Sequence, residues 1–166
     1  MALGDQALRE REVVLAAASA CLAAARAGRG GALLVVGEGG LGKTSVLEAA
    51  RLEAQAAGMG VRFARCEQLE SRLAFGVARE ALGELAGFDH EPVAESSAPY
   101  FRALQWLQQR EGGPLLVAVD DLHWADLDSL RLLAFLVRHL EGLPVAVIGT
   151  LRPWPREAAD VSGELA

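Results

Sequence analysis

The chain has 166 residues, with 16 Lys and Arg against 22 Asp and Glu, a net charge of −6, and 52% apolar residues. This length is enough for one domain with a substantial core, and the acidic balance argues against a chain built to hold a polyanion such as DNA. No apolar run is long enough to cross a membrane, and the start lacks the basic, apolar and cleavage regions of a signal peptide. The isolated cysteines Cys21 and Cys66 favour a reduced, cytoplasmic setting over a zinc site or a disulfide framework.

The first half of the chain alternates helical and extended patterns. Residues 6–27 carry apolar side chains at helical spacing, and Gly28 ends that pattern. The apolar run 32–36 predicts a strand, the stretch 45–57 a helix, and residues 61–66 a second strand. The two arginines in the second strand are typical of a sheet edge rather than of a sheet centre.

The second half continues this alternation. The patterns predict helices over residues 75–85, 99–110 and 127–140, and strands over residues 115–119 and 145–149. Asp126 is expected to cap the last of these helices. Alternating strands and helices indicate an α/β domain with a parallel sheet. We therefore predict a three-layer α/β core over residues 1–151, followed by an irregular polar tail over residues 152–166.

A glycine-rich loop lies between the first strand and its helix. It reads Gly37-Glu38-Gly39-Gly40-Leu41-Gly42-Lys43-Thr44 and leads into Ser45, which is the Walker A pattern in strand–loop–helix context. Glycines let successive backbone N–H groups point at phosphate oxygens, and the helix N-terminus adds partial positive charge. Lys43 is expected to reach the β- and γ-phosphates of ATP, and Thr44 to ligate Mg²⁺. A glycine-rich turn without a ligand is the alternative, which the Lys-Thr pair at this spacing disfavours. The loop therefore identifies the core predicted over residues 1–151 as a P-loop NTPase.

Two acidic residues directly follow the strand 115–119. Asp120 is expected to hold Mg²⁺ through a water, opposite Thr44, and Asp121 to orient or deprotonate a water beside the γ-phosphate. The alternative is two solvated acids in a loop, or a helix cap. The pairing with the phosphate loop favours the metal role for Asp120 and the base role for Asp121.

Three further residues near these strand ends are candidates for the site. His123 is open to two interpretations, a phosphate contact or coupling to a neighbouring element on one side and capping or packing on the other. Trp124 is expected in the core rather than under a ligand. Arg152 follows the last strand and is expected beside the γ-phosphate, where it would report whether that phosphate is present. The alternative for Arg152 is an exposed arginine just past a strand.

Together with the phosphate loop, several segments carry a family resemblance. They are Val119-Asp120-Asp121-Leu122-His123-Trp124-Ala125-Asp126, Ser129-Leu130-Arg131, Thr150-Leu151-Arg152-Pro153, Phe75-Gly76-Val77-Ala78-Arg79 and Tyr100-Phe101-Arg102-Ala103-Leu104. The chain resembles the STAND signalling ATPases, which are relatives of AAA+ ATPases. More narrowly, it resembles the N-terminal ATPase domain of large ATP-binding LuxR-type transcriptional regulators of actinobacteria. The resemblance covers nearly the whole chain.

The resemblance implies roles for individual residues. It carries over nucleotide and metal roles to Lys43, Thr44 and Asp120, and roles at the γ-phosphate to Asp121 and Arg152. Near the N-terminus the family often has Gly-Arg-Glu-x-Glu, and the match here is Leu8-Arg9-Glu10-Arg11-Glu12, with leucine in place of glycine. This match implies a base or ribose contact for Arg9.

The resemblance also implies a strand order of 1-4-3-2 and a larger protein. Family members continue into a fifth strand, a helical lid, often helical repeats, and a C-terminal helix-turn-helix, none of which lies within these residues. The chain is therefore expected to be a fragment or a truncated gene product, with the phosphate-loop strand at an open sheet edge that invites self-association. Contacts with the missing C-terminal domains are the other expected partners. The chain itself is expected to contact neither DNA nor a membrane.

The sequence thus predicts the ATP·Mg²⁺-binding NTPase core of a signalling regulator, with slow hydrolysis serving as a switch. It leaves open whether the chain is an active ATPase. One alternative is a nucleotide-dependent switch without turnover. The other is a small-molecule kinase, for which the sequence offers neither an acceptor pocket nor a phosphate-covering lid.

Overall fold

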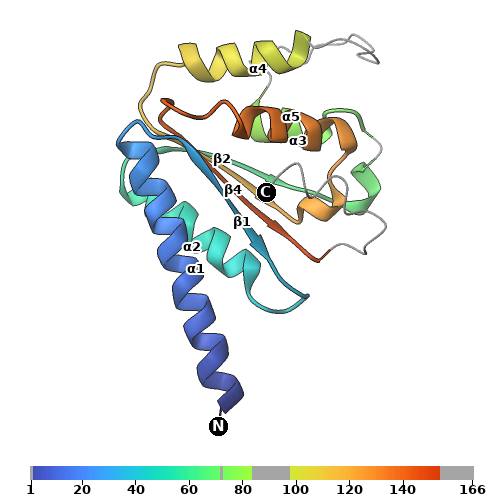
Figure 1. Cartoon of the computed structure of the whole chain (residues 1–166). Coiled ribbons are helices and arrows are strands. Elements are labelled where there is room, and N and C mark those ends of the chain that lie inside the picture. The colour runs from blue at the N-terminus through green and yellow to red at the C-terminus, as the bar shows by residue number, and fades with distance from the viewer. Residues whose placement is uncertain (1, 72, 84–97, 154–166) are drawn as a thin grey trace.

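The computed structural model describes residues 2–71, 73–83 and 98–153, and for residues 2–10 and 70 it describes the backbone only. Its centre is a parallel sheet of four strands, β1 (Gly31–Val36), β2 (Gly60–Arg65), β3 (Leu115–Asp120) and β4 (Val145–Leu151). The strand order is β1-β4-β3-β2, which confirms the order expected from the resemblance. Among the described residues, β1 and β2 are the two edge strands (Figure 1).

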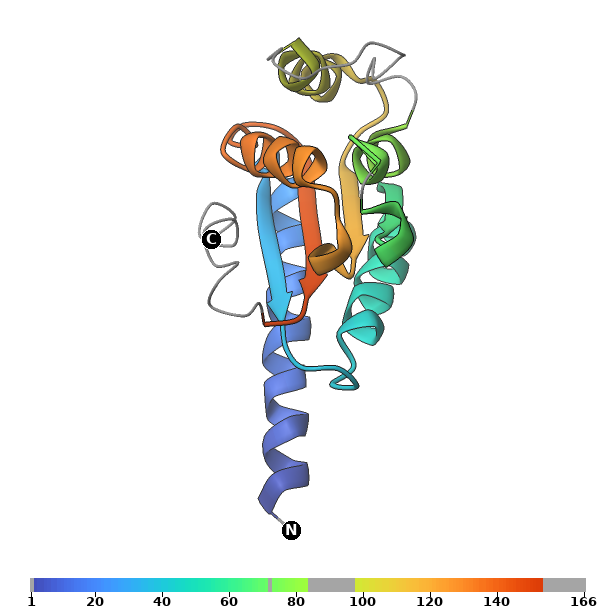
Figure 2. The same cartoon turned by 90° about the vertical axis from the view of Figure 1, so that its right-hand side faces the viewer.

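Helices cover both faces of this sheet (Figure 1). On one face lie α1 (Ala2–Arg26) and α2 (Lys43–Ala56), and on the other lie α3 (Gly76–Leu82) and α5 (Leu127–Val137). The helix α4 (Ala98–Gln109) packs on α5 and lies farther from the sheet, as Figure 2 shows. The N-terminal part of α1 extends beyond the rest of the described chain in both views. This is the α/β three-layer arrangement that the alternating patterns predict.

Side chains of β3 supply both halves of the core. Leu115, Val117 and Val119 pack with α3 and α5, whereas Leu116 and Ala118 pack with α1 and α2. All six residues of β3 are buried, because a central strand has helices over both of its faces. Burial of each Val or Leu side chain contributes about 1.5–3 kcal/mol of hydrophobic stabilisation.

The structure contains every helix and strand predicted for the described residues, with shifted ends. The helix α1 begins at Ala2 rather than at residue 6, and α5 ends at Val137 rather than at residue 140. The end of α5 moves because the chain tightens there: the N–H of His139 donates to the Leu136 carbonyl at 2.8 Å, three residues back. The predicted tail starts as irregular chain at Arg152, and its residues 154–166 lie outside the described residues. Within the described part, no helix combines the length and apolar character needed to cross a membrane.

Candidate functional site

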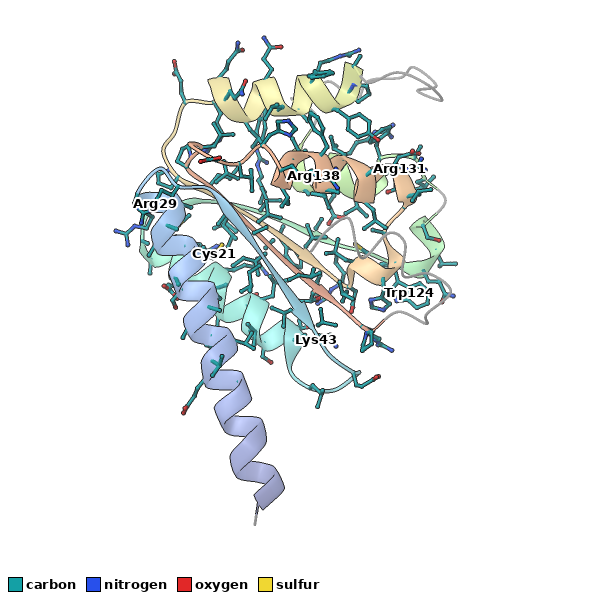
Figure 3. The ribbon with its side chains drawn as sticks, viewed as in Figure 1. Cys21, Arg29, Lys43, Trp124, Arg131 and Arg138 are labelled. Carbon is teal, nitrogen blue, oxygen red and sulfur yellow. The ribbon has the colours of Figure 1, made fainter. Side chains whose placement is uncertain are left out.

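Three of the parallel strands bring the predicted site residues together at the carboxyl end of the sheet. The carboxyl ends of β1, β3 and β4 point the same way, so the loops that follow them meet there. Figure 3 shows Lys43 and Trp124 toward this end of the strands, whereas Arg29 lies at the opposite end. The fold therefore gathers the phosphate loop, Arg152, and the acids Asp120 and Asp121 at the end of β3 in one region.

The phosphate loop wraps around the ammonium of Lys43. Gly40 and Gly42 have φ of 81° and 76°, a left-handed backbone that residues with a side chain rarely adopt. Gly42 is the N-cap of α2 and offers no side-chain cap, and the first turn of this fully described helix contains no acidic residue. Lys43 is buried, and its Nζ donates to the carbonyls of Gly37 at 2.6 Å and Glu38 at 2.8 Å. The result is a positive helix end beside a held ammonium, which is a site for an anion.

Asp120 is the most connected side chain of the site. Its carboxylate is 1% exposed and receives hydrogen bonds from three elements. Thr150 Oγ1 of β4 donates to Oδ1 at 2.5 Å, while Thr44 Oγ1 of α2 at 3.1 Å and Arg65 Nη2 of β2 at 3.2 Å both donate to Oδ2. Buried carboxylates need such partners, because an uncompensated buried charge is strongly destabilising.

The oxygen atoms of Thr44 and Asp120 fit a magnesium site. A hydroxyl and a carboxylate 3.1 Å apart are the hard ligands that Mg²⁺ prefers. Among the described side chains, those of residues 11–69, 71, 73–83 and 98–153, no three from His, Cys, Asp or Glu gather into a group able to hold a metal ion. A magnesium ion here would therefore need phosphate oxygens and water as further ligands, which is how Mg²⁺ binds in phosphate-loop sites.

Asp121 lies beside Asp120 but in a different backbone conformation. Its φ is 58°, in the left-handed region where Asp and Asn are the commonest residues besides glycine. Its N–H donates to Thr150 Oγ1 at 2.9 Å, so one hydroxyl contacts both acidic residues. The Asp121 side chain is 33% exposed, with Oδ1 3.8 Å from Nδ1 of His123. The Asp121 side chain is thus accessible to solvent beside Asp120, and its role in activating water stays a prediction.

The His123 ring is nearly buried and lies against Trp124. The side chain is 9% exposed, and neither ring nitrogen has a hydrogen-bond partner among the described residues. Burial lowers the pKa of His123, and the negative charge of Asp121 opposes that effect. The ring centroids of His123 and Trp124 are 5.0 Å apart. Trp124 packs against the core on the α5 side, as expected. A phosphate contact by His123 stays a prediction.

Arg152 lies next to the phosphate loop. A Cβ built on Gly39 would come within 3.7 Å of the Arg152 guanidinium carbon. The Arg152 side chain thus lies beside the loop, as expected for a residue near the γ-phosphate, although that role stays a prediction. The remaining loop residues Glu38, Leu41 and Ser45 are exposed. Arg9 belongs to α1, and its side chain lies outside the described residues, so its predicted base contact also stays a prediction.

Comparison with known families agrees with this geometry. Residues 7–148 match the model of a family described as the AAA ATPase domain. The chain belongs to this family. AAA ATPase domains bind nucleotide, and the part that the phosphate loop and its neighbouring acids would take in that binding stays a prediction.

Two solved structures share the fold of this AAA ATPase domain. One is the Aeropyrum pernix ORC1 protein in complex with DNA, with a TM-score of 0.59, 22% identity, and coverage of 94% of this chain and 43% of that one. The other is the Aeropyrum pernix ORC2 protein in ADPNP-ADP complexes, with a TM-score of 0.59, 14% identity, and coverage of 93% and 46%. The chain therefore spans less than half the length of either. No curated protein sequence gives a significant match.

One residue of the site that sequence reasoning missed is Arg65. It ends β2 in register with Asp120, which ends β3. The pattern in residues 61–66 indicated only that its arginines suit an edge strand. The strand order implied by the resemblance could have predicted this contact, because it makes β2 and β3 neighbours, and neighbouring parallel strands place their last residues side by side.

The second missed feature is a contact between two helix starts. Asp126 caps α5 as predicted, since its Oδ1 accepts from the N–H of Ser129 at 2.8 Å. The same carboxylate also accepts from the N–H groups of Phe75 at 2.9 Å and Val77 at 3.4 Å, at the start of α3. Ser129 adds a fourth bond by accepting from the N–H of Ala78 at 2.9 Å. Hydrogen bonds therefore connect the start of α5, which follows Asp120 and Asp121 in the chain, to the start of α3.

Proposed function

We propose that this AAA ATPase domain binds ATP with Mg²⁺ and hydrolyses it slowly, as a switch. Two observations at the carboxyl end of the strands carry the proposal together: the phosphate loop holds the ammonium of Lys43, and Thr44 contacts Asp120. Lys43 would hold the β- and γ-phosphates, while Thr44 and Asp120 would hold Mg²⁺. When bound, the metal would neutralise charge on the phosphates and help to orient them.

The hydrolytic step depends on Asp121 and Arg152. Asp121 is accessible beside Asp120, and we assign it the task of orienting or deprotonating the attacking water. Arg152 is assigned to the γ-phosphate, because its guanidinium lies against the phosphate loop. Aspartate is one methylene shorter than the glutamate that many relatives of this fold have at this position. Slow turnover suits a switch, whose signal is the lifetime of the ATP state.

We further propose that the domain works inside a larger signalling regulator of the ATP-binding LuxR type. The support is the resemblance carried by residues 119–126, 129–131 and 150–153. In such a protein, DNA contacts would belong to other domains, and the acidic chain described here would bind none itself. Its own partners would be ATP, further copies of itself, or the remaining domains. A switch without turnover is the alternative reading of the same site.

Calorimetry with ATP·Mg²⁺ tests the binding proposal. Lys43→Ala removes the positive charge inside the loop, so we expect heat of binding in the parent and none in the variant at micromolar ATP. Arg51→Ala is the matched control, because Arg51 lies on the same helix α2 but pairs with Glu48 at 2.7 Å. Equal affinity of parent and Lys43→Ala would contradict the assignment.

A chemical measurement adds an independent check. Lys43 is the only lysine of the chain, so an amine-reactive reagent has one side-chain target. We expect ATP·Mg²⁺ to protect Lys43 from acylation, as read by mass spectrometry of the peptide that contains it. Undiminished acylation at saturating ATP would count against phosphate binding at this loop.

A further inference from the structure

Arg65 touches the carboxylate oxygen that a metal ion would need. Its Nη2 donates to Oδ2 of Asp120 at 3.2 Å, and the same oxygen accepts from Thr44 Oγ1 at 3.1 Å. The other oxygen, Oδ1, is held by Thr150. Arg65 therefore shares with Thr44 the oxygen Oδ2 of Asp120, which a metal held by Thr44 and Asp120 would also use.

The two partners of this ion pair differ in their access to solvent. The Asp120 side chain is 1% exposed, whereas the Arg65 side chain is 53% exposed. A buried carboxylate is strongly destabilising without a compensating charge, so the pair stabilises the metal-free site. The half-exposed Arg65 side chain can move into solvent when a metal ion takes its place in compensating the Asp120 charge.

A guanidinium and a divalent cation compete for one carboxylate oxygen. Both are positive, so they repel each other, and both need the same lone pairs of Oδ2. Binding of a metal by Thr44 and Asp120 is therefore expected to displace Arg65 from this oxygen. The cost of that step reduces the apparent affinity for the metal, as it does whenever the competent state is only partly populated.

We propose that Arg65 competes with Mg²⁺ for Asp120 and so sets the Mg²⁺ concentration at which this domain retains ATP. The inference rests on the proposed ATP·Mg²⁺ binding and adds a regulation of that same site. In the metal-free state Arg65 neutralises Asp120, and in the loaded state its guanidinium lies in solvent. The device makes retention of nucleotide sensitive to the supply of divalent cation.

The test is a Mg²⁺ titration of the binding of a fluorescent ATP analogue. Arg65→Met keeps most of the stem and removes the charge, Arg65→Lys keeps the charge, and Arg62→Met is the matched control on the same strand. Arg62 is exposed and lies near Gly83, since its Nη1 is 3.7 Å from a Cβ built there. We expect Arg65→Met to lower the Mg²⁺ midpoint by about two- to fivefold, the factor that corresponds to a half-exposed ion pair. Arg65→Lys should lie closer to the parent, and Arg62→Met should match the parent.

The same titration in EDTA separates competition from direct nucleotide binding. We expect Arg65→Met to bind the analogue in EDTA no more tightly than the parent, because without Arg65 the negative charge of Asp120 repels phosphate. A higher Mg²⁺ midpoint in Arg65→Met would show that Arg65 supports nucleotide binding rather than competing with the metal, and it would overturn the inference. An unchanged midpoint would overturn it too. If the parent itself binds no analogue at any Mg²⁺ concentration, the proposed function fails instead.

Thermal unfolding with Mn²⁺ at a fixed, saturating concentration of the ATP analogue gives a second readout, because the metal needs phosphate oxygens as further ligands. We expect Arg65→Met to be less stable than the parent without metal and to gain more stability as Mn²⁺ is added. This pattern follows from competition, because removal of the competitor harms only the metal-free state. Equal gains in parent and variant would overturn the inference.

Discussion

The hydroxyl of Thr150 donates a hydrogen bond of 2.5 Å to Oδ1 of Asp120, across the boundary between β4 and β3. Both residues are buried. The same hydroxyl accepts the N–H of Asp121 at 2.9 Å, so one side chain orients the carboxylate of the first acid and the backbone of the second. The geometry of the proposed metal and water sites therefore depends on Thr150, although the proposed mechanism gives Thr150 no contact with the metal or with the attacking water.

We expect Thr150→Val to lower both stability and Mg²⁺-dependent nucleotide affinity. Valine has nearly the shape of threonine but cannot donate, so Asp120 loses one of its three donors and the Asp121 N–H loses its acceptor. Leaving buried polar groups without partners costs about 1–3 kcal/mol in the free energy of unfolding. Urea denaturation measures the first effect and nucleotide titration the second. Thr150→Ser retains the hydroxyl and serves as the control, and a Val variant as stable as the Ser variant would contradict this account.

We expect the two acids to separate binding from hydrolysis. Asp121→Asn keeps the size and hydrogen bonding of the side chain but removes the base, so it should retain ATP while turnover falls by about 10²- to 10⁴-fold. Asp120→Asn should weaken the Mg²⁺-dependent binding itself, since a charged metal ligand is lost. Single-turnover hydrolysis and calorimetry on both variants decide the matter. Unchanged hydrolysis in Asp121→Asn together with normal ATP·Mg²⁺ binding by Asp120→Asn would overturn both roles.

We expect Asp126→Ala to destabilise two helices at once. Its carboxylate accepts from the N–H groups of Ser129, Phe75 and Val77, so truncation leaves donors at the starts of both α5 and α3 without partners. The loss of a single cap costs about 0.5–2 kcal/mol, and the shared carboxylate should bring the total to the upper end of that range or above. Hydrogen exchange should accelerate across residues 76–82 as well as in α5. Asp128→Ala, in the first turn of α5, is the control that leaves the exchange of α3 unchanged.

Local patterns in the sequence were sufficient for the elements and for part of the site. Apolar runs predict the strands, and the spacing from Gly37 to Thr44 predicts the loop, because both depend on residues close together in the chain. The strand order was predicted from the family resemblance. The Thr44–Asp120 contact agrees with the prediction that these two residues lie opposite each other. The Asp126–Phe75 bond could not be predicted in this way, because it joins residues 51 positions apart whose meeting depends on the packing of α3 against α5. Arg65 was missed for a related reason, since its pattern describes the edge strand but not its neighbour.

The left-handed backbone at Asp121 limits which residues can replace it. At φ of 58°, aspartate, asparagine and glycine are accommodated, whereas most other residues have a strained backbone there. Lengthening the side chain to glutamate would therefore change two properties together, the reach of the carboxylate and the energy of the turn that carries it. We therefore expect Asp121→Glu alone to give no faster ATP hydrolysis than the parent. The more promising route also alters the turn, so that the backbone at this position returns to negative φ and can carry the longer acid without strain.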